Sequence, residues 1–314
     1  MTPEVTARGR RPLREGAATL AVVGAAFGFG SIAIATVLAT RAGATLVTLL
    51  LGRYVIAALV LIPIVGGLRG LAIGRARALP LLVAGGIGQA IVAVLSLSAL
   101  AYIPAASLVF LFYTYPAWVA LFARLRGTEP ITPTRIVALA LALAGIVVMV
   151  GMPGAQALHP LGVALGLSAA LAYGIYIPMV SGLQSRVDSA VATWYICVGV
   201  SAILAVAAVA RQELTWAQPI EAWAAIFWLA LVSTTFAFVL FLRGLATLGP
   251  VRTSIVSTAE PFFVATMGAL FLDQPLTLPI VLGGLLIAGA VVLLQRTTAA
   301  TGAAPSPPRP AADR

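Results

Sequence analysis

The two halves of this chain repeat each other at a fixed spacing. Pro116 recurs 145 residues later as Pro261, and Thr132 recurs at the same distance as Thr277. Chance produces matching apolar letters in a chain that is 61% hydrophobic, so the paired prolines and threonines are the evidence for the repeat. An internally duplicated hydrophobic chain is typical of folds in which a site forms where two repeats meet.

The hydrophobicity of the chain places it in a lipid bilayer. Its mean hydropathy is +1.08, and only 9% of its residues are charged, too few to cover a water-facing surface. A helix that crosses the hydrocarbon core needs about 17 to 25 mostly apolar residues. The sequence has ten such runs, at Ala17–Ala39, Thr45–Gly66, Leu79–Tyr102, Ala105–Ala123, Ile136–Met152, Leu161–Gly182, Val191–Ala210, Ala222–Leu242, Val251–Leu272 and Leu276–Gln295.

The arginines indicate how these spans are oriented. All 19 basic residues are Arg; sixteen fall on the side of the N-terminus, Arg41 and Arg211 fall on the other side, and Arg53 lies within a span. The positive-inside rule therefore predicts a cytoplasmic-membrane protein with both termini in the cytoplasm. The formal net charge of +10 then results from the arginines on the cytoplasmic side of the membrane. It does not indicate nucleic-acid binding, and we predict no nucleic-acid partner.

Five spans in each half give the repeats opposite orientations, because an odd number of crossings brings the second half into the membrane from the other side. We therefore predict an all-α integral membrane protein with ten transmembrane helices as two inverted five-helix repeats. The chain divides into a cytoplasmic N-terminal segment (1–16), a first repeat (17–152), a second repeat (161–296) and a disordered cytoplasmic tail (297–314).

Several short motifs, in their order along the chain, resemble the EamA-type transporters of the drug/metabolite transporter superfamily. They are the Gly-aromatic-Gly of the first span, Arg53-Tyr54, Tyr115-Pro116, Thr128-Glu129-Pro130, the Ala-Ala-Leu-Ala-Tyr of residues 169–173 and Glu260-Pro261. The acidic residue usual after the ninth span is displaced in Asp273-Gln274, which weakens any role for that position. The resemblance covers about residues 17–296 and implies a ten-helix secondary carrier, often an exporter, of small polar metabolites or drugs.

Glu260 is the only carboxylate well inside any of the ten spans. An ionised carboxylate at that depth is costly, so Glu260 must be neutral, paired or facing water. We expect it to carry a proton or to bind a cationic substrate group; the alternative is a packing contact with a neighbouring hydroxyl. For Arg53 we keep three readings: an ion pair with Glu260, a contact with a substrate carboxylate, or extension to the outer interface.

Pro116 and Pro261 occupy equivalent places in the fourth and ninth spans. Each removes a backbone donor and leaves carbonyl groups that a neighbour, water or a ligand must satisfy. They are candidate hinges, and static kinks are the alternative reading.

Polar and aromatic side chains at several other positions within the spans are candidates for the wall of a mid-membrane cavity. Helix contacts and interface anchors are the alternative uses of such residues. The candidates are Tyr113, Tyr115, Trp118, Gln89, Ser96, Tyr173, Tyr176, Thr234 and Ser257.

The sequence argues against an enzyme. His159 is the only histidine and Cys197 the only cysteine, so neither a metal site nor a serine–histidine pair is expected. The chain has no lysine, which excludes a Walker-type nucleotide loop. We predict no cofactor and no metal.

These observations predict a secondary active transporter that works by alternating access and with proton coupling. The resemblance implies that it exports, and that its substrates are small polar metabolites such as amino acids or drug-like compounds. Its partners are the lipid bilayer, the small-molecule substrate and the proton, while the oligomeric state is left open. A passive facilitator of the same fold and a non-transporting receptor or assembly subunit are the alternatives.

Overall fold

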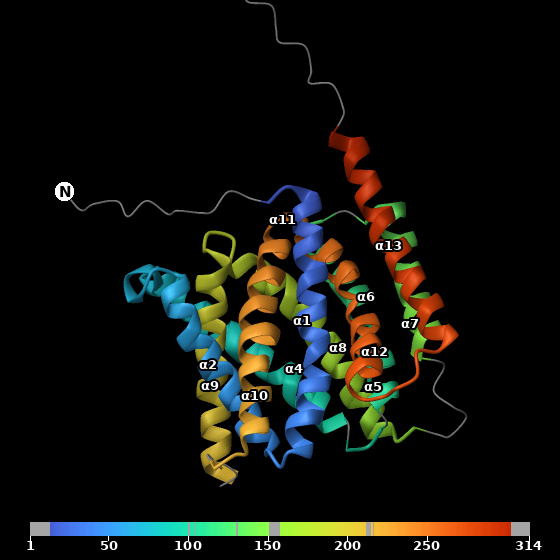
Figure 1. Ribbon diagram of the computed structural model, residues 1–314. Coiled ribbons are helices and arrows are strands. Elements are labelled where there is room, and N and C mark those ends of the chain that lie inside the picture. The colour runs from blue at the N-terminus through green and yellow to red at the C-terminus, as the bar shows by residue number, and fades with distance from the viewer. Residues whose placement is uncertain are drawn as a thin grey trace, which may run out of the picture.

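The structure is a computed structural model that describes residues 13–99, 101–103, 105–129, 131–150, 158–211, 215 and 217–302. Within these residues the regular structure is helical, and no strand occurs (Figure 1). The elements are α1 (Glu15–Arg41), α2 (Leu46–Ile64), η1 (Leu68–Leu71), α3 (Arg75–Pro80), η2 (Leu81–Gly85), α4 (Gly86–Ala99), α5 (Ala105–Phe112), α6 (Tyr115–Leu125), α7 (Pro133–Val150), α8 (Pro160–Leu183), α9 (Ser189–Arg211), α10 (Ile220–Trp228), η3 (Leu229–Phe236), α11 (Ala237–Ser257), α12 (Glu260–Phe271) and α13 (Leu278–Gly302).

Within the described ranges, eight helical stretches are long and apolar enough to cross a membrane. Two further apolar helices, Pro133–Met149 and Glu260–Phe271, are shorter. The count falls below the ten predicted spans partly because α10, η3 and α11 form one run, Ile220–Ser257, which joins the predicted eighth span to the start of the ninth. The segment between those spans, predicted as a loop, is helix with a bend.

The bend lies at Gly249, where φ is 77° and ψ is 170°. Glycine adopts this conformation without the steric cost that a Cβ would bring. Pro250 follows, and its ring nitrogen has no hydrogen to give to the preceding turn. The chain therefore changes direction within a single residue, and residues 250–257 form a separate helical segment inside α11.

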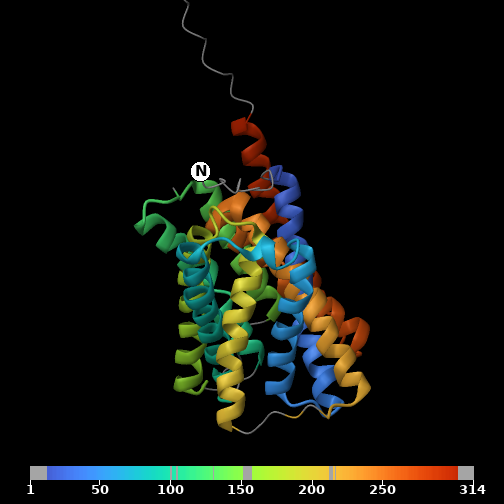
Figure 2. The same ribbon diagram turned by 90° about the vertical axis from the view of Figure 1, so that its left-hand side faces the viewer.

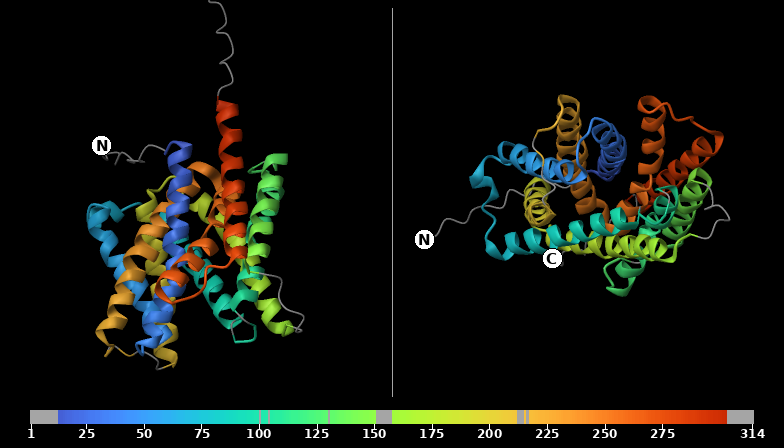
Figure 3. Two further views of the ribbon diagram at one scale, coloured as in Figure 1. Left: turned by 45° about the vertical axis from the view of Figure 1, so that its right-hand side comes forward. Right: turned by 90° about the horizontal axis from the view of Figure 1, so that it is seen from below.

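Helices of the two halves pack against each other throughout the bundle. The most extensive contacts join α7 to α13, α1 to α11, α4 to α8 and α2 to α9. Figure 2 shows α9 between α2 and α4, and Figure 3 shows α7 and α13 as a pair at one edge. The halves are therefore interlocked and do not form two separate bodies.

One pair of contacts occurs twice, once in each half. A Cβ at Gly30 in α1 would press on Phe263 and Val264 of α12. A Cβ at Gly174 in α8 would press on Trp118 and Val119 of α6, which stand 145 positions before those two residues. Each glycine lets two helix backbones approach closely, so the sequence repeat reappears as a repeat of packing.

The helix ends show how the halves are oriented. Helix α1 begins, and α13 ends, at the same end of the bundle, which we call the termini end (Figure 1). Helix α8 begins at the opposite end (Figures 1 and 3). The first helices of the two halves therefore run in opposite directions.

The predicted disordered tail begins too early. Helix α13 continues through residues 297–302 and ends at Gly302. Those residues are Thr and Ala followed by Gly, and alanine is the best helix former while glycine commonly ends a helix. Residues 1–12, 151–157 and 303–314 lie outside the described residues, so the predicted N-terminal segment and the end of the first repeat are described only in part.

Candidate functional site

Two broken helices meet near the middle of the bundle. The first break, residues 113–114, separates α5 from α6, and the second, residues 258–259, separates α11 from α12, 145 positions later. At both breaks N–H groups bond three residues back over 3.2 Å: Thr114 to Leu111 at the first, and Thr258 to Ile255 and Ala259 to Val256 at the second. The candidate hinges Pro116 and Pro261 lie in the first turn of α6 and α12, where the missing N–H costs no helix bond.

Glu260 is the first residue of α12 and is partly buried. A negative charge at this position is favoured by the exposed N–H groups of the first turn. Its carboxyl group has the Tyr113 hydroxyl as a side-chain hydrogen-bond partner. The two broken helices therefore meet through an acid on one and a tyrosine on the other.

Four tyrosines surround this contact. The ring centroids of Tyr115 and Tyr173 are 4.8 Å apart, those of Tyr113 and Tyr115 are 5.9 Å apart, and those of Tyr173 and Tyr176 are 6.0 Å apart. The Tyr115 hydroxyl has Ser257 as a side-chain partner. The structure thus gathers five of the predicted lining residues, from α5–α6, α8 and α11, around Glu260.

The hydroxyl of Tyr176 is buried and has no hydrogen-bond partner among the described residues. A buried hydroxyl that lacks a partner costs free energy, so native structures rarely leave one without a role. Tyr176 stacks on Tyr173 of the same helix, and Tyr173 is electrostatically coupled to Glu260. Its free hydroxyl is a candidate contact for a solute bound in this cluster.

Arg53 is buried, with 4% of its surface exposed. Its Nε donates to the Thr234 hydroxyl over 3.2 Å, and its guanidinium carbon lies 4.7 Å from the centre of the Tyr54 ring. Thr234 belongs to η3, a π-helical segment, and such segments are frequent at functional sites. In this conformation the Arg53 side chain is held inside the bundle by Thr234 and does not extend to the membrane interface.

Arg53 and Glu260 do not form an ion pair in the described part of the chain. They are linked through two tyrosines: Tyr54 contacts Arg53 and is electrostatically coupled to Tyr173, which is coupled in turn to Glu260. Arg53 therefore contacts Tyr54, while Glu260 contacts Tyr113. The contact of Arg53 with a substrate carboxylate stays a prediction.

Three predicted lining residues make no hydrogen bond or ring contact with the tyrosines among the described residues. Trp118 packs its Cβ against Gly174, which is a helix contact. Gln89 and Ser96 are partly buried on α4, which packs against α8 and α9, and within the described ranges no hydrogen bond joins them to the tyrosines. Their helical spacing could not show which face of α4 meets the site.

A hydroxyl network lies beside Arg53, and its member on α1, Ser31, was not singled out from the sequence. The hydroxyls of Ser31 and Ser233 are 2.7 Å apart, and the Trp228 indole N–H donates to Ser31 over 3.0 Å. Ser31 directly follows the Gly-aromatic-Gly of the first span, which was the available signal. The network ties α1 to the helix that carries Thr234.

The arrangement suits binding of a small polar molecule better than bond chemistry. No group of three or more His, Cys, Asp or Glu that could hold a metal occurs in the part of the chain that the structure describes. What the cluster offers is one acid, one buried cation, aromatic faces and two helix N-termini, which can hold charged and apolar parts of a solute.

Comparison with known proteins agrees with this view. Residues 16–151 and 160–296 each match the EamA-like transporter family. A protein of Salmonella typhimurium (strain LT2), described as "Uncharacterized inner membrane transporter YicL", is 39% identical over 71 residues, which cover 23% of this chain and 24% of that protein. The match thus spans about a quarter of that relative's length.

A solved structure described as "Crystal structure of protein" aligns with a TM-score of 0.75 at 21% identity. The alignment covers 91% of this chain and 99% of that one. At this identity the likeness concerns the fold alone.

Proposed function

Because the chain belongs to the EamA-like transporter family, we propose that it moves a small zwitterionic metabolite, such as an amino acid, across the membrane by alternating access. Members of the family are membrane transporters and not enzymes, and this chain is accordingly a multi-pass membrane protein. The substrate, the direction and the coupling are our proposal.

One observation supports it: the acid at the second helix break lies beside a cluster of tyrosines, and a buried arginine contacts a further tyrosine, Tyr54. Glu260 would bind the ammonium group of the solute or exchange it for a proton, and Arg53 would bind its carboxylate. The aromatic faces of Tyr115 and Tyr173 would cover the apolar part. The free hydroxyl of Tyr176 would add a neutral contact.

The proposed topology has ten crossings, five in each of two inverted repeats, with both termini in the cytoplasm. The opposite directions of α1 and α8 support the inversion, and so do the paired helix breaks. In other folds with inverted repeats, broken helices at the midplane build the site and the repeats rock around it. Export is favoured here by the family resemblance.

The experiment is proton-coupled exchange in proteoliposomes loaded with a panel of amino acids. Glu260→Gln should reduce solute-dependent proton movement at least tenfold, because the neutral amide can neither bind nor release a proton. Glu221→Gln, on the exposed first turn of α10, is the matched control and should transport as the wild type does.

Undiminished proton movement in Glu260→Gln would contradict the coupling. Solute flux that does not change with a pH gradient, in the wild type and in both variants, would instead support the passive facilitator.

A further inference from the structure

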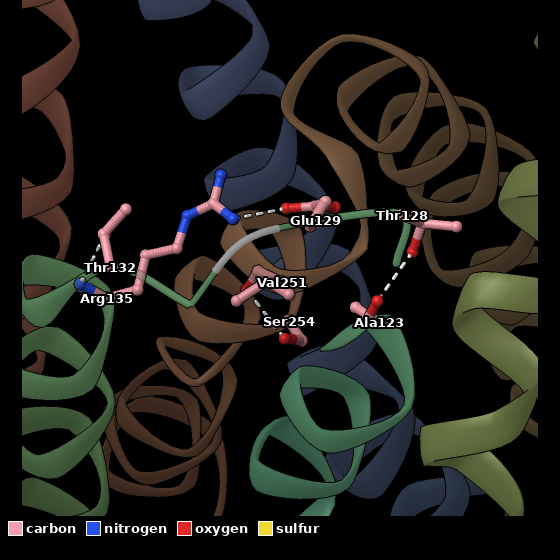
Figure 4. Close-up of polar contacts among 7 residues, drawn as sticks. All are labelled: Ala123, Thr128, Glu129, Thr132, Arg135, Val251 and Ser254. Carbon is pink, nitrogen blue, oxygen red and sulfur yellow. Dashed lines mark hydrogen bonds and ion pairs between the residues drawn. The ribbon is translucent and has the colours of Figure 1, made fainter. Parts of the chain in front are cut away.

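Charged side chains tie helices together at the termini end of the bundle. Arg135 Nη1 of α7 lies 2.8 Å from Glu129 Oε2, in the loop between α6 and α7. Arg252 Nη1 of α11 lies 3.3 Å from Glu15 Oε2 at the start of α1. Figure 4 shows the first of these pairs directly beside the segment that contains Val251 and Ser254. Neither pair touches the Glu260 cluster.

The loop around Glu129 is fixed to α6. The carbonyl oxygen of Ala123 accepts hydrogen bonds from the N–H and the hydroxyl of Thr128, over 3.0 and 3.1 Å. On the other side, the Thr132 hydroxyl accepts the N–H of Arg135 over 3.4 Å at the start of α7 (Figure 4). These bonds leave the Glu129 backbone little freedom, so its carboxylate is presented in one direction.

That direction is the start of the helical segment 250–257. The Glu129 carboxylate lies against Gly249, immediately before that segment, where an added side chain would collide with it. The first N–H groups of a helical segment have no partner within it, so a negative charge placed there is favourable. Glu129 therefore places its carboxylate at the start of a segment of the other half of the chain.

The same segment leads directly into the proposed site. It ends at Ser257, and only the break at residues 258–259 separates it from Glu260, the first residue of α12. The carbonyl oxygen of Ser254, within the segment, accepts a hydrogen bond from the Tyr115 hydroxyl over 3.4 Å. A movement of the segment away from Glu129 would thus change the polar cluster as well as the termini end.

The Glu129 carboxyl is largely buried and lies beside Arg135. Burial raises the pKa of the Glu129 carboxyl above its usual value, while Arg135, the Val251 N–H and Arg252 oppose that rise. The partners thus offset only part of the cost of burying the charge. Beside them, an apolar cavity of about 260 Å³ between α6, α7 and Val251 leaves space for side chains to rearrange.

The equivalent residue in the second half behaves differently. Gln274 stands 145 positions after Glu129, and its side-chain oxygen lies against Gly268 of its own repeat. Its N–H bonds the Gly268 carbonyl over 3.2 Å. In the first repeat, the charged group of Glu129 thus contacts the other repeat at the termini end. In the second repeat, the equivalent group is the uncharged amide of Gln274, which lies against α12 of its own repeat.

We propose that Glu129 is a positioning residue for transport, which holds segment 250–257 against the α6–α7 loop and so keeps the termini end of the carrier closed. The inference deepens the proposed alternating access and rests on it. Each transport cycle then requires the contact between Glu129 and the chain at Gly249, where segment 250–257 begins, to open and re-form.

The test is thiol accessibility, which needs no knowledge of the substrate. Cys197→Ala removes the only cysteine, and Ser254→Cys places a reporter behind the contact. In inside-out and right-side-out vesicles, a membrane-impermeant maleimide measures labelling from each face. Glu129→Ala should raise labelling from the face that carries the termini about tenfold, and Glu129→Gln, which fills the same space without the charge, should raise it less.

Gln274→Ala is the matched control and should leave that labelling rate unchanged. Wild-type labelling in both Glu129 variants would overturn the inference, and so would an equal increase from both faces, which indicates general loosening. Neither outcome would contradict the proposed function, because that function is tested separately by Glu260-dependent proton movement.

Discussion

The buried guanidinium of Arg53 depends on a single neighbouring hydroxyl for its Nε. Thr234→Val keeps the shape of the side chain but leaves that charged donor without its acceptor, so we expect a loss of about 1 kcal/mol of stability. The adjacent Thr235→Val is the control: the Thr235 hydroxyl is buried and has no partner among the described residues, so its removal should be neutral or stabilising. Thermal unfolding in detergent compares the two, and an equal effect would mean that the hydroxyl of Thr234 does not hold Arg53.

Sequence reasoning located residues of the site by their chemistry and missed their partners. Glu260 was visible because an acid within an apolar run has few structural uses. Its contact with Tyr113 and the bond from Arg53 to Thr234 were not visible, because each joins helices far apart in the sequence. In η3 the spacing departs from that of an α-helix, so no face of that helix could be assigned from periodicity.

At the scale of the elements, helix contact through glycine can be tested on α8 alone. A Cβ at Gly174 would collide with Trp118, so Gly174→Ala must push α6 and α8 apart and should cost about 1–3 kcal/mol. A Cβ at Gly182, on the same helix, would meet nothing within 4 Å, so Gly182→Ala should gain up to about 1 kcal/mol through helix propensity. Melting temperatures of the two variants should therefore move in opposite directions, and a loss of stability in Gly182→Ala would show that substitution alone is harmful.

The helices themselves were largely predictable from apolar run length, whereas their interruptions were predictable only in part. The prolines at 116 and 261 marked where the fourth and ninth spans break, because proline favours the first turn of a helix. Gly249 and Pro250 lie in a segment predicted as a loop, so the sequence indicated a turn there but not the helix that continues on both sides of it. The approach of the Glu129 carboxylate to Gly249 joins the two halves of the chain, and so it required the structure.

For the molecule as a whole, the duplicated prolines and threonines identified the two repeats, and the family resemblance was confirmed by matches over both halves. What periodicity could not supply is which helix of one half packs on which helix of the other. The close approaches at Gly30 and Gly174 identify two of these helix pairs. They depend on the shape of the backbone, so they are known only from the structure. Orientation in the membrane rests on the distribution of arginines.

The inversion of the repeats makes one prediction that no parallel arrangement shares. Thr132 and Thr277 occupy equivalent places, 145 residues apart, and both are exposed. In a protein lacking Cys197, a cysteine at 132 should react with an impermeant maleimide only from the cytoplasmic face, and one at 277 only from the outer face. Repeats that enter the membrane from the same side would place both cysteines on one face, because equivalent residues of parallel repeats end at the same depth. Labelling of both from one face would therefore rule out the inverted pair, and with it an exchange of conformations between the repeats as the means of moving solute.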